Sequence, residues 1–291
     1  MSASPQTKQG YRCVDGAWLH RTARIADGVE MAPGALIGAD VEIGAGCRVG
    51  PNAVILGPAR LGRDNVVHAS AVLGGAPQDI RYAGEPTRLE IGDGNVFREG
   101  VTVSRGAPKS GGLTSIGSRN FVMAMSHIGH DCVVEDDCIL ANGVLLAGHC
   151  HLQNGVNLAG NVALVQFTTV GRLAFVGGRA SVRKDLEPFM IHDQVRGSSA
   201  VRALSVNAIG LRRAGMPDAT IARLRRAHRI LFRDSSGFSN PATRQALADA
   251  DALCPEVDEL LEFLDRKAAG RSGRQLDGAR RCDPPGPTIA R

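Results

Sequence analysis

The apolar positions of this chain repeat every six residues over most of its first 190 residues. A period of six fits neither an α-helix, with about 3.6 residues per turn, nor a heptad repeat. Three runs keep the period without a miss. They are Leu19, Ile25, Met31, Ile37, Ile43, Val49, Ile55, Leu61, Val67 and Leu73; Ile91, Phe97 and Val103; and Ile116, Val122, Ile128, Val134, Leu140, Leu146, Leu152, Leu158, Leu164, Val170, Val176 and Val182.

Each hexad is predicted to form one short strand and one corner. The residue two places before the repeated aliphatic is usually small, as at Ala23, Ala35, Cys47 and Cys138. Glycine, asparagine and aspartate crowd the positions between, where tight corners favour them. A single turn of such a chain cannot bury its own apolar edge, so the hexads must stack into a solenoid.

Two interruptions and a change of composition define the expected domains. The register breaks at 74–90 and 105–115, and such insertions become surface loops in a solenoid. After Pro188 the pattern ends, and helical periodicity follows at 219–232, 241–253 and 256–267. We expect an N-terminal extension at 1–16, the solenoid at 17–190, an α-helical domain at 191–269 and a disordered Pro- and Gly-rich tail at 270–291.

Composition narrows the class of protein. Aromatic residues are only 4% while glycine is 36 of 291 residues, so the core must consist of small aliphatic side chains. Glycine does not recur every third residue, which excludes collagen. No apolar stretch is long enough for an integral membrane segment or a signal peptide. The seven cysteines form no C-x-x-C pair, so we expect reduced thiols and a cytoplasmic protein. The net charge of +5 favours acidic partners weakly.

The hexads resemble the repeat of left-handed parallel β-helix proteins, in which three hexads form one triangular coil. The resemblance implies an all-β solenoid with a left hand, followed here by the small α-helical C-terminal domain. Residues 18 apart then lie one above the other, because a coil holds three hexads. His130, Gly148 and Gln166 share one column, while Asp131 lies beneath His149. His127 belongs to the same edge.

Such a cluster suits acyl transfer. A histidine can remove a proton from an attacking hydroxyl near neutral pH, and a neighbouring carboxylate can orient it. A glycine N–H one coil away can stabilise the developing oxyanion. Three histidines could instead bind zinc, as in a hydratase of the β-helix class, although His130 and His149 occupy different columns.

Longer motifs resemble one enzyme family, the acyl-carrier-protein-dependent UDP-N-acetylglucosamine O-acyltransferases, which begin lipid A biosynthesis. The likeness runs from about residue 17 to about residue 233. Its motifs are residues 78–88 (QDIRYAGEPTR), 91–93 (IGD), 105–106 (RG), 127–132 (HIGHDC), 138–142 (CILAN) and 146–149 (LAGH). It implies a homotrimer with sites between subunits and no cofactor, since the acyl donor is carried on the phosphopantetheine of acyl carrier protein.

The resemblance also implies roles for single residues. His130 corresponds to the general base for the sugar 3-hydroxyl, Asp131 to its orienting partner and Gly148 to the oxyanion donor. The remaining positions contact the UDP-sugar or end the acyl-chain groove. For substrate they are Asp79, Arg81, His127, His149, Gln166, Asn207 and Arg213, and for the groove Gly178. Gly178 could equally be a corner glycine that needs positive φ.

Departures from the family pattern concentrate at the nucleotide and sugar pocket. Arg81 stands where the family has lysine, Ser104 and Val165 where histidine is common, and Ile209 and Ala214 where glutamate and arginine are usual. About four extra residues lie between Ile191 and Asn207. A paralogue with a different UDP-amino-sugar acceptor or an acetyl-CoA donor therefore stays open, as does a non-catalytic scaffold.

The helix expected at 219–232 is basic. Arg223, Arg225, Arg226 and Arg229 could dock the acidic carrier protein or simply form a solvated face. No aromatic residues interleave with them, so a nucleic-acid partner is not expected.

Overall fold

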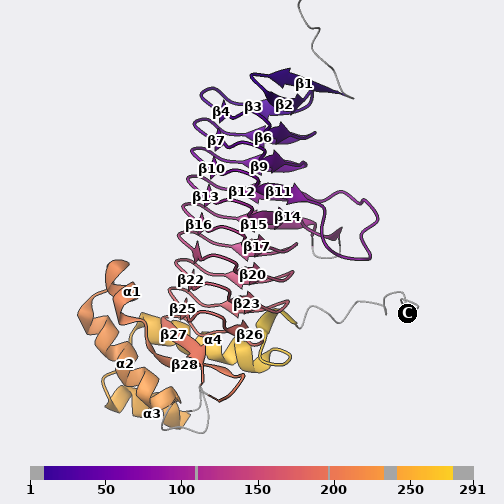
Figure 1. Ribbon diagram of the computed structural model, residues 1–291. Helices are drawn as coiled ribbons and strands as arrows, with labels where there is room; N and C mark the ends of the chain where they lie inside the picture. The colour runs from indigo at the N-terminus through magenta and orange to yellow at the C-terminus, as the bar shows by residue number, and fades with distance from the viewer. Residues whose placement is uncertain (1–9, 109–110, 196, 233–240, 278–291) are drawn as a thin grey trace, which may run out of the picture.

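The structure is a computed structural model that describes residues 10–108, 111–195, 197–232 and 241–277. The chain winds into a three-sided parallel β-helix with a helical region packed at its C-terminal end (Figure 1). Each hexad aliphatic points inward from a two- to four-residue strand, so each coil contributes one strand to each of three sheets.

The strands of the described residues stack into these three sheets in the following spatial order. Sheet one contains β1 (Tyr11–Val14), β2 (Ala17–His20), β5 (Leu36–Ile37), β8 (Val54–Ile55), β11 (Val72–Gly75), β14 (Thr102–Ser104), β17 (His127–Ile128), β20 (Leu145–Leu146), β23 (Ala163–Leu164) and β26 (Ser181–Val182). Sheet two contains β28 (Val201–Val206), β27 (Met190–Gln194), β25 (Phe175–Val176), β22 (Asn157–Leu158), β19 (Ile139–Leu140), β16 (Phe121–Val122), β13 (Val96–Phe97), β10 (Val66–Val67), β7 (Arg48–Val49) and β4 (Glu30–Met31). Sheet three contains β24 (Thr169–Val170), β21 (His151–Leu152), β18 (Val133–Val134), β15 (Leu113–Ile116), β12 (Arg88–Ile91), β9 (Ala59–Leu61), β6 (Val41–Ile43) and β3 (Arg24–Ile25).

The coil register confirms the stacking that the hexads predict. Residues 18 apart pair in parallel, as Val54 does with Val72 and Val133 with His151. All but two of the repeated aliphatics are buried in one continuous core, and those two, Ile25 and Met31, pack against it partly buried.

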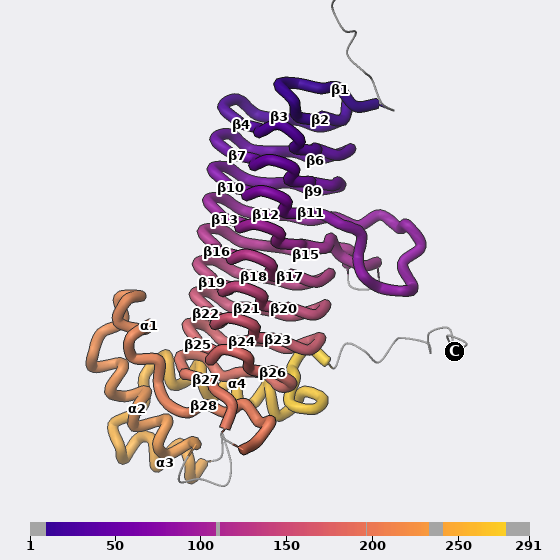
Figure 2. Tube along the Cα trace, viewed as in Figure 1, coloured from indigo at the N-terminus to yellow at the C-terminus, as the bar shows by residue number. Residues whose placement is uncertain are grey.

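The two interruptions are loops that project from the side of the solenoid (Figure 2). Strand β11 runs on to Gly75 and β12 begins at Arg88, so the first loop is 76–87. The second loop lies between Ser104 and Leu113. Both loops are shorter than the interruptions of the repeat at 74–90 and 105–115, because the strands on either side include some residues of the interrupted stretches.

The helical region contains α1 (Ala208–Arg213), α2 (Asp218–Phe232), α3 (Pro241–Asp249) and α4 (Pro255–Ala269). Its apolar faces form a second core with Phe189 and Met190 from the end of the solenoid. Arg172 pairs with Glu259 and Lys267 with Glu187, which ties α4 to the last coils. No helix of the described residues is long and apolar enough to cross a membrane.

Three expectations about domain boundaries differ from the structure. Residues 191–194 and 201–206, expected in a helical domain, lie in β27 and β28, which extend sheet two past β25. The expected N-terminal extension contains β1, which pairs antiparallel with β2. Residues 270–277, expected to be disordered, fold against the last coil, where Asp185 accepts from the Gln275 N–H at 2.8 Å. Residues 278–291 lie outside the described part of the chain.

Candidate active site

The predicted cluster forms at the corner that follows β17 and β20. His149 donates its backbone N–H to the carbonyl of His130 at 2.9 Å, and Phe167 donates to that of Gly148 at 3.3 Å. Asp131, His149 and Phe167 all have positive φ, between 58° and 65°. Non-glycine residues rarely adopt this conformation, so the coil stack must hold them there.

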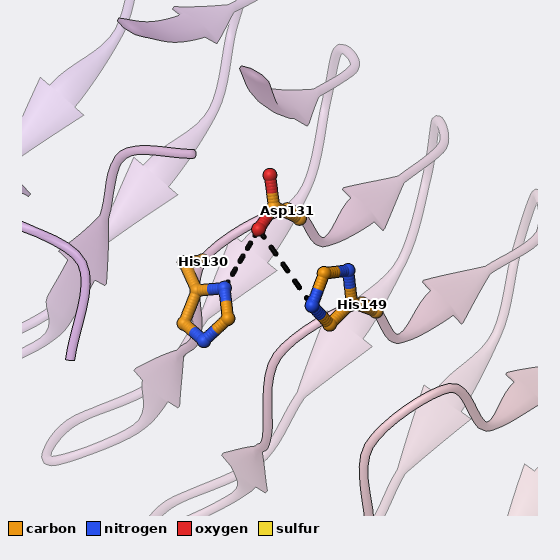
Figure 3. Close-up of side chains that lie close together, drawn as sticks. All are labelled: His130, Asp131 and His149. Carbon is orange, nitrogen blue, oxygen red and sulfur yellow. Dashed lines mark hydrogen bonds and ion pairs between the residues drawn. The ribbon is translucent and has the colours of Figure 1, made fainter. Parts of the chain in front are cut away.

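Asp131 joins the two imidazoles at the centre of the site (Figure 3). One carboxylate oxygen, Oδ2, lies 2.7 Å from Nδ1 of His130 and 3.8 Å from Nε2 of His149. The other, Oδ1, accepts from the backbone N–H of Ala107 at 2.9 Å, and the Asp131 backbone N–H donates to Oγ1 of Thr114. A carboxylate only accepts, so it selects the tautomer of His130 that carries its proton on Nδ1. Nε2 of His130 is then the basic atom.

Gly148 lies against the His130 ring. A Cβ atom at this position would be 2.6 Å from Cε1 and 2.7 Å from Nε2 of His130, so only glycine allows this approach. Gly148 is buried, and its backbone N–H donates no hydrogen bond to any residue that the structure describes. Buried backbone donors are seldom left unpaired, and this one is available to an oxyanion.

The two other histidines have different surroundings. His149 stacks on Phe167, with ring centroids 4.4 Å apart, and meets His130 edge to face. Burial, with a smaller contribution from His130, lowers the pKa of His127. Its Nδ1 lies 2.8 Å from Oγ1 of Thr102. His127 is therefore neutral at neutral pH and presents its other nitrogen as a hydrogen-bonding group.

The loop at 76–87 carries Asp79 and Arg81 as an ion pair. The guanidinium donates from Nε and Nη2 to the two carboxylate oxygens at 3.1 and 3.0 Å. Hydrogen bonds from Arg81 lower the pKa of Asp79 to about 2 against the opposing effect of burial, and a smaller electrostatic contribution from His130 acts in the same direction. Asp79 is thus ionised and within electrostatic reach of the site.

The remaining candidate residues lie farther from this cluster. Gln166 borders a hollow of about 380 Å³ with Val165, Arg183 and Arg274. Asn207 caps α1, accepting from the Gly210 N–H, and its Nδ2 donates to the Leu173 carbonyl. Arg213 is exposed in the last turn of α1. Figure 1 places α1 on the side of the molecule away from the two loops. A single chain therefore does not bring Asn207 and Arg213 to His130.

Gly178 does not have positive φ; the neighbouring Arg179 does, at 63°. The corner explanation for this glycine is therefore wrong. A Cβ at Gly178 would be 3.3 Å from the Gly160 carbonyl oxygen and 3.9 Å from Cβ of Ala159, so a larger side chain requires the Gly160 carbonyl to shift by a few tenths of an ångström.

His130, Asp131 and His149 also offer ligand atoms within 4.8 Å of one another. The zinc alternative called for three histidines, but His127 is not part of this group. The group instead contains a carboxylate, which His130 and Ala107 already engage.

The residues that orient the cluster carry no signal in the hexad pattern. Thr102 precedes the second loop and Ala107 lies within it, so that loop shifts their register relative to the cluster. Thr102 pairs with His127, 25 residues away rather than 18. Only the length of this interruption could have placed these two residues, whereas Thr114 lies 17 residues before Asp131, within the ordinary coil spacing.

Comparisons with known proteins show which family the chain resembles. Two segments, 40–75 and 113–148, match the family model for the bacterial transferase hexapeptide (six repeats). Residues 185–273 match the model for domain 2 of UDP-N-acetylglucosamine O-acyltransferase. An acyl-[acyl-carrier-protein]–UDP-N-acetylglucosamine O-acyltransferase from Anaeromyxobacter sp. (strain K) is 44% identical over 194 residues, which are 66% of this chain and 72% of that protein.

Solved structures extend the likeness over most of the chain. The UDP-N-acetylglucosamine acyltransferase of Francisella novicida is 30% identical, with a TM-score of 0.79 over 87% of this chain and 90% of that one. The enzyme of Bacteroides fragilis is 31% identical, with a TM-score of 0.80 over 87% and 96%. The fold is thus the expected left-handed β-helix of the hexapeptide-repeat acyltransferases. Within that class, the chain belongs to the UDP-N-acetylglucosamine O-acyltransferase family.

Proposed function

We propose that this protein transfers an acyl chain, such as a 3-hydroxyacyl chain, from acyl carrier protein to the 3-hydroxyl of UDP-N-acetylglucosamine, the first step of lipid A synthesis. Its relative from Anaeromyxobacter is named as an acyltransferase that uses acyl carrier protein and acylates an oxygen of UDP-N-acetylglucosamine. One observation in this chain supports it most strongly. The Asp131-oriented His130 directs its basic nitrogen towards the edge where the buried Gly148 N–H has no partner among the described residues.

The reaction follows from these three groups. Nε2 of His130 removes the proton of the sugar hydroxyl as its oxygen attacks the thioester carbonyl. The negative charge that develops on the carbonyl oxygen is stabilised by the Gly148 N–H. Asp131 stabilises the imidazolium ion that forms. Collapse breaks the carbon–sulfur bond, and the departing phosphopantetheine thiolate takes the proton from His130. The donor carries its own prosthetic group, so the protein itself supplies no cofactor.

In this proposal, residues around the reacting centre bind the acceptor sugar nucleotide. His127, kept neutral by burial, and His149, held by Phe167, offer ring nitrogens to the sugar. Asp79 and Arg81 reach it from the loop, and Gln166 borders the hollow on the next coil.

The active unit in this proposal is a homotrimer in the cytoplasm. Asn207 caps α1 and Arg213 ends it, and Figure 1 shows α1 on the side of the molecule away from the two loops, so a neighbouring subunit would supply these residues to the UDP end. This arrangement would place each site between two chains.

The carrier protein is expected to dock on α2. Two of the four arginines on this helix are already engaged, because Arg223 and Arg226 pair with Asp251 at 3.4 and 3.1 Å. Arg225 and Arg229 are exposed beside a hollow of about 300 Å³. These two are the better candidates for an acidic partner.

A different UDP-amino sugar is the second candidate acceptor. Ile209, 65% exposed on α1, presents an apolar surface where the family usually has glutamate. Incubation with UDP-N-acetylglucosamine, its 3-amino analogue and a panel of acyl carrier thioesters, read by mass, separates the two acceptors. Acetyl-CoA in the same panel tests the alternative donor.

The His130→Ala variant tests the role of the base. Turnover should fall by about 10²- to 10⁴-fold, the usual contribution of general base catalysis. The melting temperature should also fall, because the buried Asp131 carboxylate loses its His130 partner, so circular dichroism must show that the variant is still folded. Near-normal turnover of the variant would contradict the proposal, and so would a wild type that acylates no UDP-sugar. Metal analysis of the active protein addresses the zinc alternative.

A further inference from the structure

One arginine outside the reacting centre joins parts of the chain that lie far apart in sequence. The guanidinium of Arg105 donates from Nη1 to the carbonyls of Gly74, at 2.8 Å, and Gly57, at 3.2 Å. Its Nε donates to Oγ1 of Thr87 at 3.2 Å, and its Nη2 lies 3.4 Å from the hydroxyl of Tyr82. Gly74 lies just before the 76–87 loop, Thr87 is the last residue of the loop, and Tyr82 lies in its middle.

These contacts continue to the candidate substrate residues. The Tyr82 hydroxyl donates to the Glu85 carbonyl, and the Tyr82 backbone N–H donates to the Asp79 carbonyl at 3.0 Å. Tyr82 directly follows Arg81, which pairs with Asp79. The position of this ion pair therefore depends on where the Tyr82 ring is held.

The backbone beside Arg105 contacts both sides of the site. Arg105 donates its N–H to Gly75 and Gly106 donates to Arg88, so the two ends of the first loop are held. Two residues on, the Ala107 N–H donates to Asp131. A Cβ on Gly106 would overlap the backbone of Gly112 and Leu113, so the residue after Arg105 packs directly against the end of the second loop.

Arg105 suits this task because of its shape. Its partners in the described chain are carbonyls and hydroxyls rather than carboxylates. A side chain that binds all of them must therefore carry several N–H donors in a fixed plane, as a guanidinium does. A lysine in its place would have a single ammonium group on a flexible stem. That group could not donate at the same time to acceptors that lie on opposite sides of the Arg105 guanidinium.

We propose that Arg105 is a positioning residue that holds the 76–87 loop, and with it Asp79 and Arg81, over the acceptor side of the site. The inference rests on the proposed function, because it assumes that this loop binds the UDP-sugar. Loss of Arg105 frees the loop while His130, Asp131 and Gly148 keep their coil positions, so acceptor binding suffers more than the chemical step.

The test compares Arg105→Gln with the wild type and with Arg88→Met. Arg88 is a matched control, because its side chain forms only an exposed pair with Glu90 in the described chain. Arg105→Gln should raise KM for UDP-N-acetylglucosamine at least tenfold while kcat and KM for the acyl carrier protein change less than about threefold. Arg105→Lys should recover only part of the loss, and Arg88→Met should resemble the wild type.

Hydrogen exchange supplies a readout that does not depend on activity. Amides of residues 76–87 should exchange faster in Arg105→Gln, while those of β17 and β20 keep their protection. Should Arg105→Gln fold poorly, Thr87→Val removes the hydroxyl that accepts from Nε of Arg105 and should give the same pattern in weaker form.

An unchanged KM, or unchanged loop exchange, would overturn the inference. A parallel loss of kcat, of both KM values and of the melting temperature would show a purely structural role and would also overturn it. A wild type without UDP-sugar activity would refute the proposed function instead, and the exchange experiment would still decide whether Arg105 holds the loop.

Discussion

Replacing Asp131 with asparagine tests the site most sharply, because both carboxylate oxygens have assigned partners. Oδ2 faces Nδ1 of His130 at 2.7 Å and Oδ1 accepts from the Ala107 N–H at 2.9 Å, in a side chain only 3% exposed. Asparagine has one oxygen and one amide nitrogen, so it can satisfy only one of these donors.

The two orientations of the asparagine have different costs. If its nitrogen faced Ala107, two buried donors would meet, at a cost of about 1–3 kcal/mol. The favoured orientation keeps the oxygen on Ala107 and turns the amide towards Nδ1 of His130. Nδ1 must then accept, so the proton moves to Nε2, which can no longer act as a base. The expected loss in kcat is about 10²- to 10⁴-fold, or about 3–5 kcal/mol of transition-state stabilisation.

Steady-state acylation of UDP-N-acetylglucosamine, followed by mass, measures this loss. KM for the sugar nucleotide should change little, since Asp131 acts through His130. Asp137→Asn is the matched control, because Asp137 is 55% exposed and pairs with Arg119. An Asp131→Asn variant that keeps more than about a tenth of the wild-type kcat, with an unchanged melting temperature, would refute the assigned tautomer.

Three further predictions concern single residues. Gly148→Ala should lower kcat about a hundredfold or more with little change in melting temperature, because the new Cβ displaces the His130 ring; normal kcat would show that the ring can move freely. Gly178→Met should shift the preferred donor to a shorter acyl chain in a competition among acyl carrier thioesters, and an unchanged preference would remove Gly178 from the groove. Burial lowers the pKa of His192 from its ordinary 6.5 despite the neighbouring Glu187, so the unfolded chain binds the proton more readily. The free energy of unfolding, measured with denaturant, should therefore decrease as pH falls below about 6.5, by about 1.4 kcal/mol for each pH unit between the two pKa values. His192→Gln should lose less over the same range, and an equal loss would contradict this assignment.

The solenoid could be predicted from sequence because its contacts are regular. Each aliphatic such as Ile55 or Leu140 meets residues a fixed number of positions away, so a one-dimensional period carries the three-dimensional register. The same rule placed His130, Asp131, Gly148 and His149 together. The helices near 219–232, 241–253 and 256–267 were also predicted, and the structure confirms each, with the second ending earlier, at Asp249.

Contacts between residues that do not lie at a regular sequence spacing could not be predicted from the hexad repeat. Met190–Gln194 becomes a strand because the edge of β25 offers it a partner, which a search for helical periodicity does not detect. The 270–277 segment has the composition of a disordered tail, yet Arg274 donates to the Arg183 carbonyl and Gln275 to Asp185. Ala107 meets Asp131, 24 residues away, only because the second loop returns to the coil.

The antiparallel strand β1 has a consequence for how large an assembly this fold can form. A parallel β-helix ends in unpaired N–H and C=O groups that would accept the coil of another copy, and repeated addition would build a fibre. In sheet one, β1 runs against β2 and so against the direction of the parallel strands that follow. An incoming parallel coil therefore meets a strand of the wrong polarity. The four residues Tyr11–Val14 therefore close the N-terminal edge of sheet one to parallel extension, while the antiparallel β28 and the helices cover the opposite end of the solenoid.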